Sequence, residues 1–210
     1  MDKILELTTR FPKLESCSQD VLSAVNAIIE CYKSGGKVMI CGNGGSSSDS
    51  SHIVGELMKG FLKLRPLSAE KREELKSNCQ DISNELLDNL QGSLPAINLT
   101  ENSGIISAFA NDVEPANVYA QQVLGYGKPG DVLIGITTSG NSSNILNACY
   151  LAKGLGLTVI GLTGRDGGKL KSASDICVIA PEHETFKIQE LHLPIYHCIC
   201  AMVEEAFYTE

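Results

Sequence analysis

Several patterns that would assign this chain to a well-defined class of protein are missing from it. It contains no C-x-x-C pair, although it has 8 cysteines, and most of these lie inside apolar runs. We therefore expect small buried hydrophobic side chains in a reducing compartment, rather than a disulfide framework or a zinc finger. No apolar stretch approaches the ~20 residues of a membrane-spanning helix, and residues 1–11 lack the features of a signal peptide. These absences predict a cytoplasmic protein without a membrane partner.

Positive charge is also in short supply. The chain has 17 Lys and Arg residues against 25 Asp and Glu residues, which gives a formal net charge of −8. This balance argues against nucleic acid or an anionic membrane as the main partner. A small anionic substrate remains compatible with it, because a few local hydrogen-bond donors can hold a phosphate on an acidic protein. The length of 210 residues favours one domain with a sizeable core.

Apolar runs alternate with helical patterns along most of the chain. This alternation is typical of a parallel sheet with helices on both faces, so the sequence predicts an α/β fold with about five strands. Helices are expected at 2–10 and 18–34, and a long final helix at 184–208 is apolar around most of its circumference. Packing in a homo-oligomer is the simplest reason for such a helix. The predicted strands are 37–41, 95–100, 131–137, 157–164 and 175–180.

The stretch 67–92 differs in character from the rest. It is polar, charged and helix-forming, and apolar residues such as Leu75, Ile82, Leu86 and Leu90 recur at helical spacing. We interpret it as a helical insertion between two strands of the single domain 1–210. A solvated surface hairpin is the simpler role for it, and a lid or an oligomer contact is the alternative.

A hydroxyl-rich turn follows the predicted strand 131–137. It reads T-T-S-G-N-S and precedes a helical pattern. One helix cap needs one hydroxyl, whereas this turn offers four in six residues. Hydroxyls and free backbone N–H groups at a helix N-terminus can bind a phosphate without any lysine. The turn therefore predicts a phosphate cradle, whose hydroxyls belong to Thr137, Thr138, Ser139 and Ser142.

A second turn, G-N-G-G-S at 42–46, follows the first predicted strand. Its glycines allow positive φ angles and a close approach of the backbone to a ligand. A glycine-rich turn alone is weak evidence for a ligand site. The chain lacks G-x-x-x-x-G-K-[ST] and G-x-G-x-x-G at this turn, which disfavours nucleoside triphosphate hydrolysis and dinucleotide binding.

Histidines are few, with four in the chain. His52 and Glu56 lie four residues apart on an expected helix and so share one face, an arrangement that suits a divalent transition metal. A pair of this kind is more often an ordinary hydrogen bond when taken alone. Gln189 and His197 lie eight residues apart on the last helix, about 12 Å along its axis. That separation is a strain for two ligands of one ion, unless the side chains lean toward each other or another chain contributes. His192 is expected to be packed.

Taken in order, these motifs resemble those of the phosphoheptose isomerases of the sugar-isomerase (SIS) domain group. The matching pieces are GNGGS, then D-x-x-H-x-x-x-E, then Asn111-Asp112, then TSGNS, and finally IQE-x-H-x(4)-H. They cover nearly the whole chain except 67–92. The sequence departs at Thr137, where the family commonly has Ser, and in the extra helical segment that follows Arg65-Pro66.

The resemblance implies a three-layer α-β-α sandwich that assembles as a homotetramer with sites at subunit interfaces. It implies that a divalent metal, zinc or a similar ion, is bound by His52, Glu56, Gln189 and His197. It implies that substrate is lined by Asn43, Gly44, Gly45, Ser46, Glu56, Asn111, Asp112, Thr137, Thr138, Ser139, Ser142 and Gln189.

The activity implied is a ketose–aldose isomerisation through an enediol, from D-sedoheptulose 7-phosphate to D-glycero-D-manno-heptose 7-phosphate. Two acid–base groups are needed, and we assign Glu56 to the sugar carbons and His197 to the oxygens. A carboxylate bound tightly to a metal is a poorer base, so coordination by Glu56 must be loose or must change during turnover.

Two other functions remain open at this stage. A non-catalytic SIS protein that binds a phosphosugar would keep the cradle but would not need His52, Glu56, Gln189 and His197. A different SIS enzyme, acting on another sugar phosphate, is kept open by the altered segment after Arg65.

Overall fold

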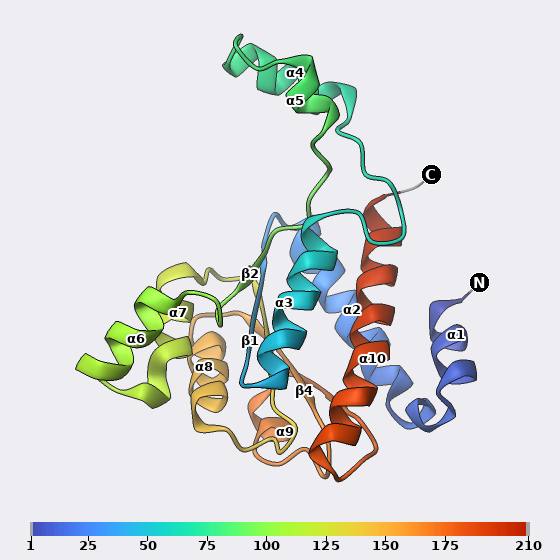
Figure 1. Ribbon diagram of the computed structural model, residues 1–210. Helices are drawn as coiled ribbons and strands as arrows, with labels where there is room; N and C mark the ends of the chain where they lie inside the picture. The colour runs from blue at the N-terminus through green and yellow to red at the C-terminus, as the bar shows by residue number, and fades with distance from the viewer. Residues whose placement is uncertain (1, 209–210) are drawn as a thin grey trace.

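Five short strands pair in parallel to form the central sheet. The computed structural model describes residues 2–208, and the strands lie in the order β2-β1-β3-β4-β5 (Figure 1). Four of the strands fall within predicted apolar runs, and β1 extends one residue beyond the predicted run 37–41, so the predicted α/β class is confirmed. Their bounds are Val38–Gly42 (β1), Ala96–Asn98 (β2), Val132–Ile136 (β3), Thr158–Thr163 (β4) and Ile176–Ile179 (β5).

Alternate side chains along each strand enter two different hydrophobic cores. In β1, Val38 and Ile40 join one core, whereas Met39 and Cys41 join the other. This alternation follows from the pleat of a strand, which points successive side chains to opposite faces. Because both faces are buried, the strands are apolar throughout, and the molecule has three layers.

Helices from different parts of the chain cover the two faces. On one face lie α1 (Lys3–Arg10), α2 (Ser18–Lys33), α3 (Gly45–Met58) and the long α10 (Thr185–Phe207). On the other face lie α6 (Ser103–Asp112), α7 (Val118–Tyr126), α8 (Ser143–Gly154) and α9 (Leu170–Ala173). Short 3-10 helices lie at Pro12–Cys17 and Pro115–Asn117. Within the described residues, no helix has the length and apolar character to cross a membrane.

Helices α3 and α10 run side by side in the same direction. Gly45, the first residue of α3, contacts Gln189 early in α10, and His52 contacts His197 further along both helices. Figure 1 shows the two helices parallel to each other on the same face of the sheet. Seven residues along α3 therefore correspond to eight along α10, so the two helices advance together.

The stretch 67–92 contains α4 (Ala69–Asn78) and α5 (Asn84–Asp88). These helices stand away from the sheet and its covering layers (Figure 1). The chain leaves and re-enters the domain at neighbouring points, because Gly92 N donates to Arg65 O at 2.6 Å. We call residues 67–92 the arm. Its buried leucine is Leu87 rather than Leu86 or Leu90, which are 51% and 44% exposed.

A buried ion pair fastens the end of α3 to α10. Arg65 and Glu204 both have fully buried side chains, with Nε and Oε1 2.8 Å apart. Arg65 also donates from Nη1 to Leu57 O (2.7 Å) and from Nη2 to Glu56 O (3.1 Å), so it satisfies carbonyls at the C-terminal end of α3. The Glu204 carboxylate accepts from the backbone N–H groups of residues 61–63. We call this arrangement the Arg65 clamp.

Burial alone raises the pKa of Glu204, but the hydrogen bonds from residues 61 and 62 and from Arg65 outweigh it and hold the pKa below its usual value. A carboxylate whose pKa is lowered in the folded state stabilises the protein above its unfolded-state pKa. That contribution is lost as the pH falls through the folded-state pKa.

We expect Glu204→Gln to lower the free energy of unfolding by about 3–5 kcal/mol, because it leaves the Arg65 charge buried without an anion. Asp88→Asn, which removes the exposed partner of Arg72 in the arm, is the matched control and should cost less than ~1 kcal/mol. Urea unfolding followed by circular dichroism measures both. The gap between wild type and Glu204→Gln should narrow as the pH is lowered, and equal losses for the two variants at pH 7 would contradict the role of the clamp.

Candidate functional site

The two glycine- and hydroxyl-rich turns lie next to each other at the carboxyl ends of paired strands. Gly42 at the end of β1 is in register with Ile136 at the end of β3, so the turns that follow are neighbours. Side chains also tie them together, since the amides of Asn43 and Asn144 exchange two hydrogen bonds of 2.9 Å. Tyr119 supports the first turn by donating to Gly42 O at 3.0 Å. Ligands of open parallel sheets bind at such strand ends.

The hydroxyls of the second turn bond to one another rather than cap α8. Ser142 occupies the N-cap position of α8, yet its side chain accepts no hydrogen bond from the helix. Its Oγ lies 2.9 Å from Thr137 Oγ1, which also lies 3.5 Å from Ser139 Oγ. Thr163 Oγ1 holds the turn from behind by donating to Thr137 O at 2.6 Å. A helix N-terminus without a side-chain cap, beside clustered hydroxyls, is suited to an anion.

The first turn depends on two glycines. Gly44 has a φ of 56°, in the left-handed region that glycine favours. A Cβ placed on Gly45 would lie 2.5 Å from Gln189 Nε2, so a larger residue would push α10 away from the start of α3. Gln189 therefore lies at Gly45 in the first turn, where the next residue, Ser46, is buried.

A second group of polar side chains meets further along α3 and α10. His52 Nε2 lies 3.2 Å from Glu56 Oε1 and 3.3 Å from His197 Nε2. Glu56 Oε2 accepts from Lys59 Nζ at 3.1 Å. Burial, and secondarily the neighbouring His52, lowers the pKa of His197, which favours its neutral form. We call His52, Glu56 and His197 the His–Glu cluster.

The donor types of the His–Glu cluster fit a divalent metal, although its geometry is not that of a finished site. Two imidazole nitrogens and one carboxylate are a ligand set that catalytic zinc uses, with a further position open for water or substrate. All three facing atoms can act as lone-pair acceptors, and so they need a proton or a cation between them. Within residues 2–208, however, no group of three or more His, Cys, Asp or Glu side chains is arranged to hold an ion.

Four further predicted site residues lie away from the His–Glu cluster. Gln189 is at the first turn, whereas the metal set implied by the resemblance would place it with His52 and His197. Asn111 and Asp112 end α6, where both are exposed and Asn111 donates to Asp112 at 2.8 Å. Thr138 lies half-buried in the second turn.

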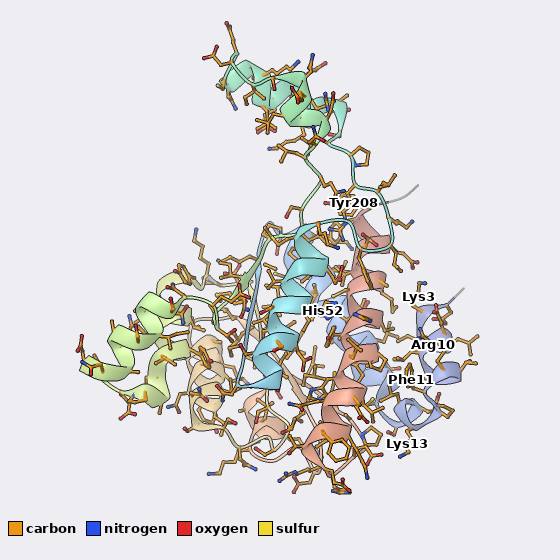
Figure 2. The ribbon with its side chains drawn as sticks, in the orientation of Figure 1. Lys3, Arg10, Phe11, Lys13, His52 and Tyr208 are labelled. Carbon is orange, nitrogen blue, oxygen red and sulfur yellow. The ribbon has the colours of Figure 1, made fainter. Side chains whose placement is uncertain are left out.

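A cavity of about 360 Å³ opens on the other side of His197. Its walls come from α1, α10 and the segment after α3, so the strand-end turns do not line it. Figure 2 shows Lys3 and Arg10 on α1 and Phe11 just after it, on the side of α10 away from His52. The cavity therefore gives a route to His197 that is distinct from the two turns.

Three further residues lie near the site, and of these Asp49, the first residue of the D-x-x-H-x-x-x-E motif, had a signal in the sequence. Asn144 links the two turns, while Asp49 and Tyr196 contact each other between α3 and α10 at 3.4 Å. Asp49 lies three residues before His52, so helical spacing places it on nearly the same face. Tyr196 gives no comparable signal. It is next to His197 in the sequence, and adjacent residues of a helix point in different directions.

Comparison with known proteins assigns the chain to a family. An SIS domain model matches residues 2–84 and 90–164. The phosphoheptose isomerase of Clostridium acetobutylicum is 39% identical over 192 residues, which cover 91% of this chain and 85% of that protein. The phosphoheptose isomerase of Rhodospirillum rubrum is 35% identical over 196 residues, covering 93% of this chain and 90% of that protein.

Solved structures agree with this assignment. The phosphoheptose isomerase of Francisella tularensis superimposes with a TM-score of 0.77 at 31% identity, covering 95% of this chain and 92% of that one. The phosphoheptose isomerase of Neisseria gonorrhoeae gives a TM-score of 0.75 at 29% identity, covering 96% and 94%. The chain therefore belongs to the phosphoheptose isomerase family of SIS-domain proteins, and it is an isomerase.

Proposed function

We propose that the protein converts D-sedoheptulose 7-phosphate to D-glycero-D-manno-heptose 7-phosphate through an enediol. The observation that carries this proposal is that Glu56 on α3 and His197 on α10 both approach His52, at 3.2 and 3.3 Å, and that α3 begins at the first glycine-rich turn. From Gly45 to His52, α3 rises about 10 Å. That span is comparable to the length of an extended seven-carbon sugar phosphate.

The phosphate end is assigned to the two strand-end turns. Ser139, Ser142 and Thr137 supply hydroxyl groups, and the uncapped N-terminus of α8 supplies backbone N–H groups. Asn43, Gly44, Gly45, Ser46, Thr138 and Gln189 are proposed to line the remainder of the substrate. Asn111 and Asp112 are proposed to line it as well, on the resemblance alone.

Glu56 and His197 are proposed to move the protons. Glu56 removes the proton from the carbon beside the carbonyl and returns it to the neighbouring carbon, and His197 exchanges protons with the two oxygens. The lowered pKa of His197 supports this role, because a neutral imidazole can accept a proton from a hydroxyl. Burial of Glu56 between α3 and α10, with its side chain 13% exposed, keeps water from competing for the proton.

A divalent metal, zinc or a similar ion, is proposed as cofactor. His52, Glu56 and His197 would hold it, with Gln189 left at the first turn in this chain. When bound, such an ion would polarise the substrate carbonyl. Glu56 is proposed to coordinate the ion loosely, which would leave its carboxylate free to act as a base.

A cytoplasmic homotetramer is proposed from the resemblance. Phe186 and Leu193 of α10 are 56% and 40% exposed, and apolar side chains on a long helix of this kind favour burial against another copy. Sedimentation velocity gives the assembly state directly.

We expect Glu56→Gln to reduce turnover of sedoheptulose 7-phosphate by about 10²–10⁴-fold, because it removes the base while keeping the size of the side chain. Aldose formation is followed by NMR. Glu30→Gln is the matched control, since Glu30 lies at the exposed end of α2 and pairs with Lys33. Normal turnover by Glu56→Gln would disprove its assignment as the base.

Treatment with a chelator should abolish turnover, and added zinc should restore it. Activity that survives chelation, in protein shown to be metal-free by elemental analysis, would remove the metal from the proposal.

Binding of sedoheptulose 7-phosphate without turnover under every metal supplement would favour the alternative function, a phosphosugar-binding regulator. Turnover of another sugar phosphate alone would favour a different substrate for the same site.

Ser142→Ala should raise the KM for sedoheptulose 7-phosphate by about 10- to 100-fold, the value of one hydrogen bond to a charged group. The effect on kcat should be smaller, because the phosphate is bound equally in the ground and transition states. Ser23→Ala is the control, since that hydroxyl donates to Gln19 O within α2. An unchanged KM, with an unchanged inhibition constant for inorganic phosphate, would place the phosphate elsewhere.

A further inference from the structure

Tyr196 lies between α3 and α10, directly behind His52. It is 3% exposed, and its hydroxyl is 3.0 Å from His52 Nδ1 and 3.4 Å from Asp49 Oδ1. His52 Nδ1 is the ring nitrogen that does not face Glu56 and His197. The tautomer of His52 therefore depends on whether the Tyr196 hydroxyl donates to the ring or accepts from it.

The surroundings of Asp49 decide the direction of these hydrogen bonds. His192 is fully buried, and its Nε2 lies 3.1 Å from Thr163 O. A carbonyl oxygen only accepts, so this nitrogen of His192 carries the proton, and Nδ1 of the neutral ring is a lone pair. That lone pair faces Asp49 Oδ2 at 4.0 Å, and neither atom has a hydrogen-bond partner among the described residues.

At 4.0 Å, Asp49 Oδ2 and His192 Nδ1 are too far apart for a hydrogen bond, so Tyr196 is the donor that reaches the Asp49 side chain among the described residues. Burial raises the pKa of Asp49 to about 6 and lowers the pKa of His192 to about 4. His192 is therefore neutral at pH 8, whereas a pKa near 6 leaves Asp49 ionised at that pH. Asp49 Oδ1 is an acceptor in either state of the carboxyl group, since an ionised carboxylate has no donor.

Tyr196 is consequently oriented toward Asp49. Its O–H donates to Asp49 Oδ1, and its oxygen accepts from the Nδ1–H of His52. The opposite orientation would leave Asp49 Oδ1 without a hydrogen-bond donor. An unsatisfied acceptor of this kind lowers stability, and most buried polar atoms in proteins have a partner. With the proton on Nδ1, His52 presents the lone pair of Nε2 to Glu56 and His197.

We propose that Tyr196, held by Asp49, is a positioning residue that fixes His52 as the Nδ1–H tautomer and keeps its Nε2 lone pair directed at Glu56 and His197. The catalytic meaning of this arrangement rests on the proposed function. The tautomer itself does not, because it is a property of the free protein. Outer partners of this kind fix the ring orientation of metal-binding histidines and raise their basicity.

The test uses the full chain, labelled with ¹⁵N and freed of metal by a chelator. Long-range ¹H–¹⁵N NMR spectra distinguish the protonated from the bare ring nitrogen of each histidine, and the His52→Gln spectrum identifies the signals of His52. Wild-type protein at pH 8 should show a proton on His52 Nδ1. Tyr196→Phe should give a mixture of the two tautomers, and its affinity for zinc should fall by about 10- to 100-fold.

Tyr32→Phe is the matched control, because Tyr32 is also buried and its hydroxyl donates to a backbone carbonyl, Pro95 O, at 3.3 Å. It should leave both the His52 signals and the zinc affinity unchanged.

Asp49→Asn should retain the wild-type tautomer, because the oxygen of its amide still accepts from Tyr196. Asp49→Ala removes that acceptor, so it should release the tautomer as Tyr196→Phe does, and it serves if Tyr196→Phe does not fold.

A proton on His52 Nε2 in the wild-type protein would overturn the proposal. So would an unchanged tautomer and zinc affinity in Tyr196→Phe or Asp49→Ala. Absence of isomerase activity would count against the proposed function only, since the tautomer is measured without substrate or metal.

Discussion

Parallel packing of α3 against α10 is the constraint on which the candidate site depends. These helices are far apart in the sequence, at residues 45–58 and 185–207. The Arg65 clamp joins the end of α3 to Glu204, and Gly45 allows Gln189 to approach its beginning. A shift of one residue between the helices, about 1.5 Å, would separate His52 from His197. Close packing of side chains allows only a few discrete positions of one helix along another. The clamp therefore holds α3 and α10 in a single register rather than in a range of registers.

The sheet was predictable from sequence, because each strand is buried on both faces and therefore reads as an apolar run. The arm was predictable only in part. The sequence indicated a helical insertion, in its simpler form a surface hairpin, but its spacing did not place the break between α4 and α5 or the burial of Leu87 in place of Leu86 and Leu90. A break of this kind depends on local capping by Ser83, whose hydroxyl accepts from Leu86 N, and periodicity alone does not register it.

The site was predictable where its chemistry is local. Hydroxyls and glycines at two strand ends indicated an anion cradle, and the structure adds that Ser142 leaves α8 uncapped. The eight-residue separation of Gln189 and His197 has a simple explanation in the parallel helices, which carry these residues to different levels of α3. Tyr196 was not predictable, because its role arises from α3 lying beside it. Pairing between distant helices is tertiary information that spacing within one helix does not contain.

The point where the arm joins the domain has a consequence for the evolution and engineering of this protein. The two ends of the arm are held together by the Gly92–Arg65 hydrogen bond, and Pro66 pairs with Gln91 beside it. Any segment inserted there closes on itself without separating the strands it interrupts, and loop-closure entropy grows only slowly with length. The junction is therefore a suitable site for the fusion of a further domain. It lies next to Arg65, which helps to fix the register of α3 against α10.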